Sequence, residues 1–136
     1  VGLDGFDCQY RNGFEDDVEA RRGKGGAGSE LLVTKSVNSA FHGSPDLDAW
    51  LKEAGISQFA VAGIQTNMCV ETTARVGGNL GYEVLFVYDA TYTFGLEGPF
   101  GWRREAEELA RATAVSLHGG GFARVVTTGE VVEAAG

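Results

Sequence analysis

Cysteine and histidine are scarce in this chain of 136 residues, which contains two of each. The two cysteines, Cys8 and Cys69, do not form a Cys-x-x-Cys pair. Together with two histidines they are too few for a structural zinc site. The size of the chain also allows a core that needs neither disulfides nor a metal. We therefore expect a reducing, cytoplasmic setting.

Basic residues are also few, because 11 lysines and arginines stand against 19 acidic residues and give a net charge of −8. Such a balance repels phosphate backbones and anionic lipid surfaces. No apolar run approaches the roughly 18 residues that indicate a membrane span. The composition thus argues against nucleic-acid and membrane partners.

Glycine, in contrast, is abundant, and seven of the 21 glycines lie in the first thirty residues. Eleven of those thirty residues are charged, and they show neither helical nor strand periodicity, which predicts a loop, linker or tail. Within them, Gly23–Gly28 matches G-x-G-x-x-G, but it does not lie between a strand and a helix as a nucleotide site requires. We expect a divergent N-terminal segment over 1–29 and one domain over 30–136.

From Leu31 onward, apolar runs alternate with amphipathic stretches. Ser44 and Pro45 would cap and begin the first helix, and Gly55 would end it. This alternation predicts an α/β fold, a three-layer αβα Rossmann-like domain whose mainly parallel sheet is covered on both faces. The predicted strands are 31–34, 59–63, 83–88 and 123–127, and the predicted helices are 46–54, 67–77, 103–117 and 130–135.

Cys69 is the most informative residue, because it lies just beyond the carboxyl end of a predicted strand, where ligands bind in open parallel sheets. With Thr66 or Asn67 as N-cap, the thiol would lie in the first helical turn. The helix dipole there favours a thiolate, and backbone N–H groups can hold an oxyanion. The alternative is a small cysteine buried in the core.

Lys35 follows the first apolar strand, and a cation at that position can favour a nearby thiolate or hold a carbonyl oxygen. The alternative is a solvated surface charge. A group of aromatic residues near the strand ends fits either a pocket lining or core packing: Phe41, Tyr92, Phe94 and Trp102.

Four blocks of the sequence resemble the isochorismatase-like cysteine hydrolases. The blocks are Val-Thr-Lys-Ser-Val-Asn-Ser-Ala-Phe at 33–41, Val-Ala-Gly-Ile-Gln-Thr-Asn-Met-Cys-Val-Glu-Thr-Thr-Ala-Arg at 61–75, Val-Tyr-Asp-Ala at 87–90 and Leu-His-Gly-Gly-Gly-Phe at 117–122. The resemblance covers residues 30–136, and the lysine and cysteine blocks together are highly specific.

This resemblance implies a hydrolase that cleaves a C–N bond of a small molecule through a covalent thioester. Cys69 would be the nucleophile and Lys35 the catalytic lysine. The backbone N–H groups of Gln65 and Cys69 would form the oxyanion hole, next to a cis peptide bond between Ile64 and Gln65. The family further implies a homo-oligomer, while the lack of an Asp-x-His-type cluster predicts no metal and no organic cofactor.

The N-terminal segment departs from the family pattern. The family's catalytic aspartate ends a strongly apolar first strand, and here only Asp7 gives a faint match. A solvated loop aspartate is the alternative. Asp7 and Lys35 are too close in sequence for the family's first helix and second strand, so the fold should lack its first strand–helix–strand unit. A catalytically silent domain that only binds or oligomerises is therefore the rival to an active hydrolase.

Overall fold

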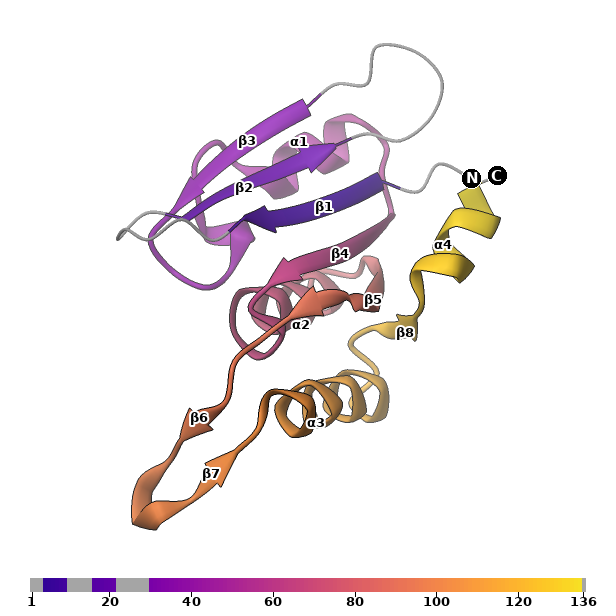
Figure 1. Cartoon of the computed structure of the whole chain (residues 1–136). Coiled ribbons are helices and arrows are strands. Elements are labelled where there is room, and N and C mark those ends of the chain that lie inside the picture. The colour runs from indigo at the N-terminus through magenta and orange to yellow at the C-terminus, as the bar shows by residue number, and fades with distance from the viewer. Residues whose placement is uncertain (1–3, 10–15, 22–29, 136) are drawn as a thin grey trace.

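The computed structural model describes the backbone of residues 4–9, 16–21 and 30–135, with side chains over 30–134. Within these residues one sheet has the order β3-β2-β1-β4-β5-β8 (Figure 1). Its strands are β1 (Asp4–Gln9), β2 (Asp16–Arg21), β3 (Glu30–Lys35), β4 (Gln58–Ile64), β5 (Glu83–Tyr92) and β8 (Arg124–Val126). β2 is antiparallel to both of its neighbours, and all other pairs are parallel. The mainly parallel sheet is thus confirmed.

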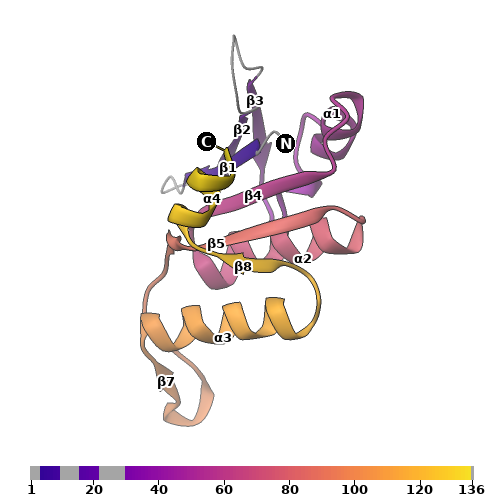
Figure 2. The ribbon, with the colours of Figure 1, turned by 90° about the vertical axis from the view of Figure 1, so that its right-hand side faces the viewer.

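Helices cover both faces of this sheet (Figures 1 and 2). Successive strand residues point to opposite faces. Phe59 and Val61 of β4 therefore belong to a core cluster with residues of α1, α2 and α3, whereas Ala60 packs in a second cluster with Val131 of α4. In the described part of the chain the α-helices are α1 (Leu47–Glu53), α2 (Glu71–Asn79), α3 (Ala106–Gly119) and α4 (Thr128–Ala135). The expected three-layer αβα arrangement is confirmed.

The loop expected over the first thirty residues is wrong for β1 and β2. Both strands lie inside the sheet, between β3 and β4, where we expected a missing strand–helix–strand unit. They are antiparallel neighbours, so they are not a parallel pair of that unit. Backbone N–H and C=O groups form the ladder whatever side chains they carry, which is why a charged, glycine-rich sequence gave no strand signal. Residues 22–29, which contain the whole Gly23–Gly28 motif, lie outside the described residues, and the boundary at 30 stays a prediction.

The first helix begins one residue later than expected, and its cap is different. The Asp46 carboxylate accepts a hydrogen bond from the Ala49 N–H, so Asp46 and not Ser44 is the N-cap. Pro45 precedes the helix in a cis peptide bond with Ser44. Gly55 follows the helix with a φ of +70°, the left-handed conformation that glycine adopts at helix ends, so the predicted stop is confirmed.

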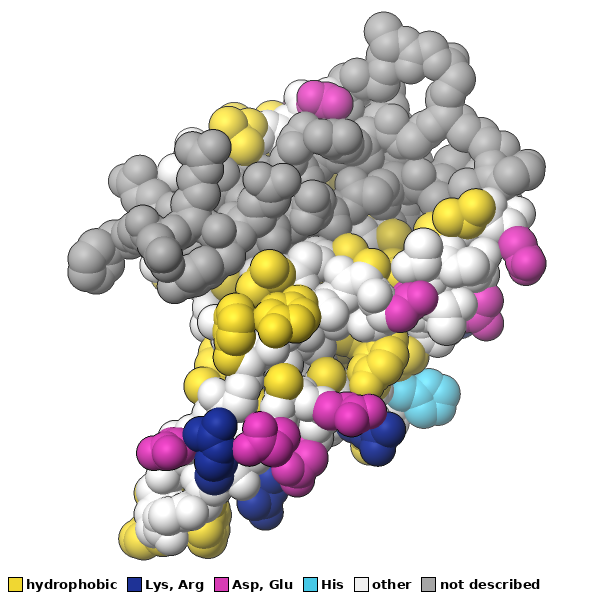
Figure 3. Space-filling model, viewed as in Figure 1, with side chains coloured by type: hydrophobic (Ala, Val, Ile, Leu, Met, Phe, Trp, Pro, Cys, Tyr) yellow, Lys and Arg dark blue, Asp and Glu magenta, His cyan; other side chains and the backbone are white. Residues whose placement is uncertain are grey.

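The region between β5 and α3 differs most from the prediction. β5 extends to Tyr92, and the start of the predicted 103–117 helix instead forms β7 (Arg103–Arg104), which pairs with β6 (Leu96–Glu97). A 3₁₀ turn, η3 (Pro99–Gly101), joins the two strands. This hairpin projects from the body of the molecule, with apolar side chains at its tip (Figures 1 and 3). Phe100 there is 86% exposed.

Candidate active site

Lys35 reaches the site because β3 buries alternate side chains on one face. Val33 and Lys35 point inward and are 0% and 3% exposed, while Thr34 between them points outward. Lys35 is the last residue of the strand, so its ammonium group lies at the carboxyl end of the sheet. The surface-charge interpretation of Lys35 is therefore wrong.

Lys35 contacts Cys69 at the carboxyl end of the sheet. Lys35 Nζ donates a hydrogen bond to Cys69 Sγ at 3.4 Å and another to the Val37 carbonyl oxygen at 3.0 Å. Cys69 is 6% exposed. A buried ammonium in contact with sulfur stabilises the thiolate over the neutral thiol. The contact joins the two residues that the sequence singled out, while their catalytic roles stay predictions.

Cys69 lies on a tight turn after β4. The Ile64–Gln65 peptide bond is cis, as the resemblance implied. A π-helical turn, η2 (Thr66–Val70), follows and leads directly into α2. The expected side-chain cap from Thr66 or Asn67 is wrong, because Gln65 is the N-cap residue and its carbonyl accepts the N–H groups of Met68 and Val70. π-Helical turns of this kind are frequent at functional sites.

Asn38 also contacts the cysteine and was not singled out from the sequence. The Cys69 thiol donates to Asn38 Oδ1 at 3.6 Å. Asn38 lies only three residues after Lys35, so these two contacts to sulfur come from the last residue of β3 and from the loop that follows it. The feature of the sequence that could have indicated Asn38 is its place inside the 33–41 block that resembles the family. Nothing in an asparagine's position in sequence indicates the direction of its side chain.

Two threonines that follow the core of β5 contact the same turn. Thr66 Oγ1 donates to Thr91 Oγ1 at 2.9 Å, and Thr93 Oγ1 donates to Asn67 Oδ1 at 2.5 Å. Thr66 and Thr93 are buried. The predicted strand ended at Tyr88, so neither threonine was singled out as a contact of the cysteine turn.

Asp7, the candidate for the family's acid, lies in β1 rather than in a loop. Its Cα is in register with Ala62 of β4 and Glu19 of β2. β1 therefore runs beside the strand that leads to the cysteine turn. The side chain of Asp7 lies outside the described side chains, and its role as an acid stays a prediction.

The aromatic candidates divide between core and surface. Phe41 lies in the short helical turn η1 (Ala40–His42) and packs against Phe59 and Tyr82, with ring centroids 5.9 Å away in both cases. Tyr92, Phe94 and Trp102 are instead 59%, 48% and 63% exposed. Phe41 is therefore half-buried against the core.

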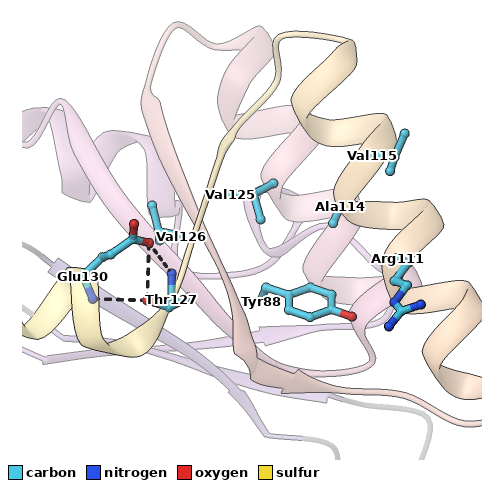
Figure 4. A pocket seen from close by; sticks show the side chains of 8 residues that line it. All are labelled: Tyr88, Arg111, Ala114, Val115, Val125, Val126, Thr127 and Glu130. Atoms are coloured by element: carbon cyan, nitrogen blue, oxygen red, sulfur yellow. Dashed lines mark hydrogen bonds between the residues drawn. The ribbon is translucent and has the colours of Figure 1, made fainter.

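An open groove elsewhere on the molecule contains neither Lys35 nor Cys69. It lies between α3, β5, β8 and the start of α4 and has a volume of about 390 Å³ (Figure 4). Its lining is mostly apolar and contains neither cysteine nor lysine, so the chemistry favours the Lys35–Cys69 site. The lining residues are Tyr88, Arg111, Ala114, Val115, Val125, Val126, Thr127 and Glu130.

Two further findings concern the described part of the chain. Its His, Cys, Asp and Glu residues form no group of three or more that could hold a metal ion. None of its helices combines the length and the apolar character needed to cross a membrane.

A family model supplies the decisive comparison, because the isochorismatase domain matches residues 19–127 of this chain. The chain belongs to the isochorismatase family. It is 34% identical over 103 residues to YrdC, an uncharacterised isochorismatase family protein of Bacillus subtilis, covering 76% of this chain and 54% of that protein. It is 37% identical over 99 residues to nicotinamidase 3 of Arabidopsis thaliana, covering 73% and 43% of the two chains.

Solved structures of the family agree with this assignment. A cysteine hydrolase from Pseudomonas syringae pv. phaseolicola superposes with a TM-score of 0.67 at 30% identity, covering 75% of this chain and 48% of that one. The chain thus spans about half the length of the curated relatives it matches. The family resemblance drawn from the lysine and cysteine blocks is confirmed.

Proposed function

We propose that this isochorismatase-family chain is a cysteine hydrolase that cleaves the C–N bond of a small amide or related molecule. The observation that carries this proposal is the 3.4 Å contact between Lys35 Nζ and Cys69 Sγ at the carboxyl edge of the sheet. Nicotinamidase 3, one of the relatives, is named for hydrolysis of an amide. Family membership and site chemistry therefore favour the same class of reaction.

The reaction would proceed through a thioester. The Cys69 thiolate attacks the carbonyl carbon, a C–S bond forms, and the carbonyl electrons move to oxygen. When the oxyanion collapses, the C–N bond breaks and the leaving nitrogen takes a proton. Water then adds to the thioester, the C–S bond breaks, and the acid and the thiolate are released.

Three groups would support these steps. The Lys35 ammonium stabilises the thiolate and the negative charge that develops during attack. Backbone N–H groups of Gln65 and Cys69, on the turn after the cis peptide bond, would hold the oxyanion. Asp7 is our candidate for the group that takes the thiol proton and later activates water.

A side chain of the cysteine turn also offers a hydrogen-bond acceptor for a substrate. Among the described residues, Gln65 Oε1 is buried without a hydrogen-bond partner. A buried acceptor of this kind is costly to leave unpaired, and a substrate N–H or a water molecule would satisfy it. We further propose that the protein acts without a metal or organic cofactor, as a cytoplasmic homo-oligomer with no nucleic-acid or membrane partner.

Trapping the acyl-enzyme tests the proposal. We expect mass spectrometry to detect a mass increase on the peptide that contains Cys69 after incubation with members of a panel of small amides. Cys69→Ala should abolish both the adduct and turnover, whereas Cys8→Ser, which changes the other cysteine in the sequence, should retain the adduct. Turnover that survives in Cys69→Ala would contradict the proposal, and a chain that binds amides without forming an adduct would be the silent domain.

A further inference from the structure

The end of β5 contains a bulge that changes which residues lie beside the cysteine turn. Val61 of β4 is in register with Phe86, but Gly63 is in register with Thr91. β5 therefore advances five residues while β4 advances two. In an unbroken register Gly63 would lie opposite Tyr88, so the bulge brings Thr91 to that position. Bulges of this kind re-aim side chains beside active sites.

The Thr91 hydroxyl joins the bulge to the turn. It donates to the Tyr88 carbonyl oxygen at 3.0 Å and accepts from Thr66 Oγ1 at 2.9 Å. Thr66 is fully buried, and it is the first residue of the turn that carries Cys69. The Thr91 hydroxyl thus forms hydrogen bonds both to the backbone of the bulged strand, at the Tyr88 carbonyl, and to the side chain of Thr66 at the start of η2.

A second contact lies two residues further along. Thr93, 3% exposed, donates to Asn67 Oδ1. On its other side the bulge is also fixed, because Asp89 Oδ1 accepts hydrogen bonds from the backbone N–H and the hydroxyl of Thr128 at the start of α4, at 2.7 and 2.9 Å. The bulge is therefore held at α4 and in turn contacts consecutive residues of the cysteine turn.

We propose that Thr91 and Thr93 are positioning residues that hold the Cys69 turn at the distance from which Lys35 stabilises the thiolate. This role rests on the proposed function, in which the thiolate is the nucleophile. Neither threonine contacts Cys69 in any interaction described above, so both would act through Thr66 and Asn67. Loss of either hydroxyl should reduce the thiolate population without removing any group that contacts sulfur.

The test measures the rate at which iodoacetamide alkylates Cys69 in the full chain, as a function of pH, with the modified peptide identified by mass spectrometry. We expect Thr91→Val to slow alkylation at pH 7 at least fivefold and to move the rate profile to higher pH. Thr93→Val should show the same direction of change. Thr91→Ser, which keeps the hydroxyl, should react within about twofold of the unmodified protein.

A matched control separates positioning from loss of stability. Thr113 of α3 is also 3% exposed, and Thr113→Val should leave the rate and its pH profile unchanged. If Thr91→Val fails to fold, Thr66→Val decides the question for the first contact, since it removes the same hydrogen bond from the other side, and Thr93→Val tests the second contact by itself. A wild-type rate profile in the folded valine variants, or an equal change in Thr113→Val, would overturn the proposal.

These outcomes are independent of the substrate. If the proposed hydrolase function is wrong, the unmodified protein forms no acyl adduct with any amide, yet the alkylation profiles still report on the threonines. If only the positioning role is wrong, the adduct forms and the valine variants react normally.

Discussion

Replacing Lys35 by methionine removes the ammonium beside Cys69 while keeping a long apolar side chain in the same buried space. The two charges of an ammonium–thiolate pair at 3.4 Å attract each other by about 5 kcal/mol at an effective dielectric constant of about 20. Desolvation of both buried charges offsets part of this attraction. If roughly half remains, the thiolate loses about 2–3 kcal/mol of stabilisation, which corresponds to a decrease of about 30- to 160-fold in its population.

Alkylation of Cys69 by iodoacetamide at pH 7 measures this population, because the thiolate is the reactive form. Lys35→Met should therefore react at least about 30-fold more slowly than the unmodified protein, with urea denaturation confirming that the variant is folded. Lys52→Met is the matched control. Lys52 is an exposed lysine paired with Asp48 at 2.7 Å, and its loss should not change the rate. Equal rates for Lys35→Met and the unmodified protein would refute the electrostatic role of Lys35.

Four smaller predictions concern Tyr82, its partner Asp48 and Gly43. Tyr82 donates to Asp48 Oδ1 at 2.5 Å, so Tyr82→Phe should lower the free energy of unfolding by about 1 kcal/mol in urea titrations. Burial raises the pKa of Tyr82; the unfolded chain therefore ionises first, and stability should fall above pH about 10 in the unmodified protein but not in Tyr82→Phe. Hydrogen bonds from Lys52 and then Tyr82 lower the pKa of Asp48, so its contribution should be lost as pH falls below the ordinary aspartate range, as acid titration of unfolding would show. Gly43→Ala would place a Cβ 2.5 Å from Val33 Cγ1 and should destabilise the fold by about 1–3 kcal/mol, measured in urea; an unchanged midpoint would contradict this.

The elements that could be predicted are those whose side chains form an apolar pattern or whose ends carry a glycine. Phe59 and Val61 of β4 lie on one face and Ala60 on the other, so the strand reads as a continuous apolar run. α3 was recognised by its apolar stripe and α1 by the glycine that follows it. β1 and β2 were missed because their pairing depends on backbone hydrogen bonds rather than on an apolar pattern.

The sequence singled out the two residues that contact each other, Lys35 and Cys69, but not the residues that surround them. Lys35 and Cys69 stand in sequence blocks with a family resemblance, and each follows a predicted strand. Asn38, Thr91 and Thr93 became visible only with the fold. The bulge in β5 determines which hydroxyl lies next to Thr66, and a sequence does not show where a strand gains residues relative to its neighbour.

The contact between Lys35 and Cys69 depends on the shape of the whole sheet. β3 is separated from β4 by β2 and β1. Three steps of about 4.8 Å would place the axes of these strands roughly 14 Å apart in a flat sheet, more than a lysine side chain can span. Adjacent strands rotate by about 20–25°, so the twist accumulates to roughly 60–75° over the same three steps.

One hydrogen bond and the burial of alternate β3 side chains bring the end of β3 toward the cysteine turn. The chain after β3 passes over α2, where the Ala40 N–H donates to Thr73 Oγ1 at 3.1 Å, and α2 continues directly from the turn that carries Cys69. Burial of Val33 and Lys35 on the same face directs the ammonium to that side of the sheet. Strand alternation and the η1–α2 contact therefore both direct the Lys35 ammonium toward Cys69 Sγ, which it contacts at 3.4 Å.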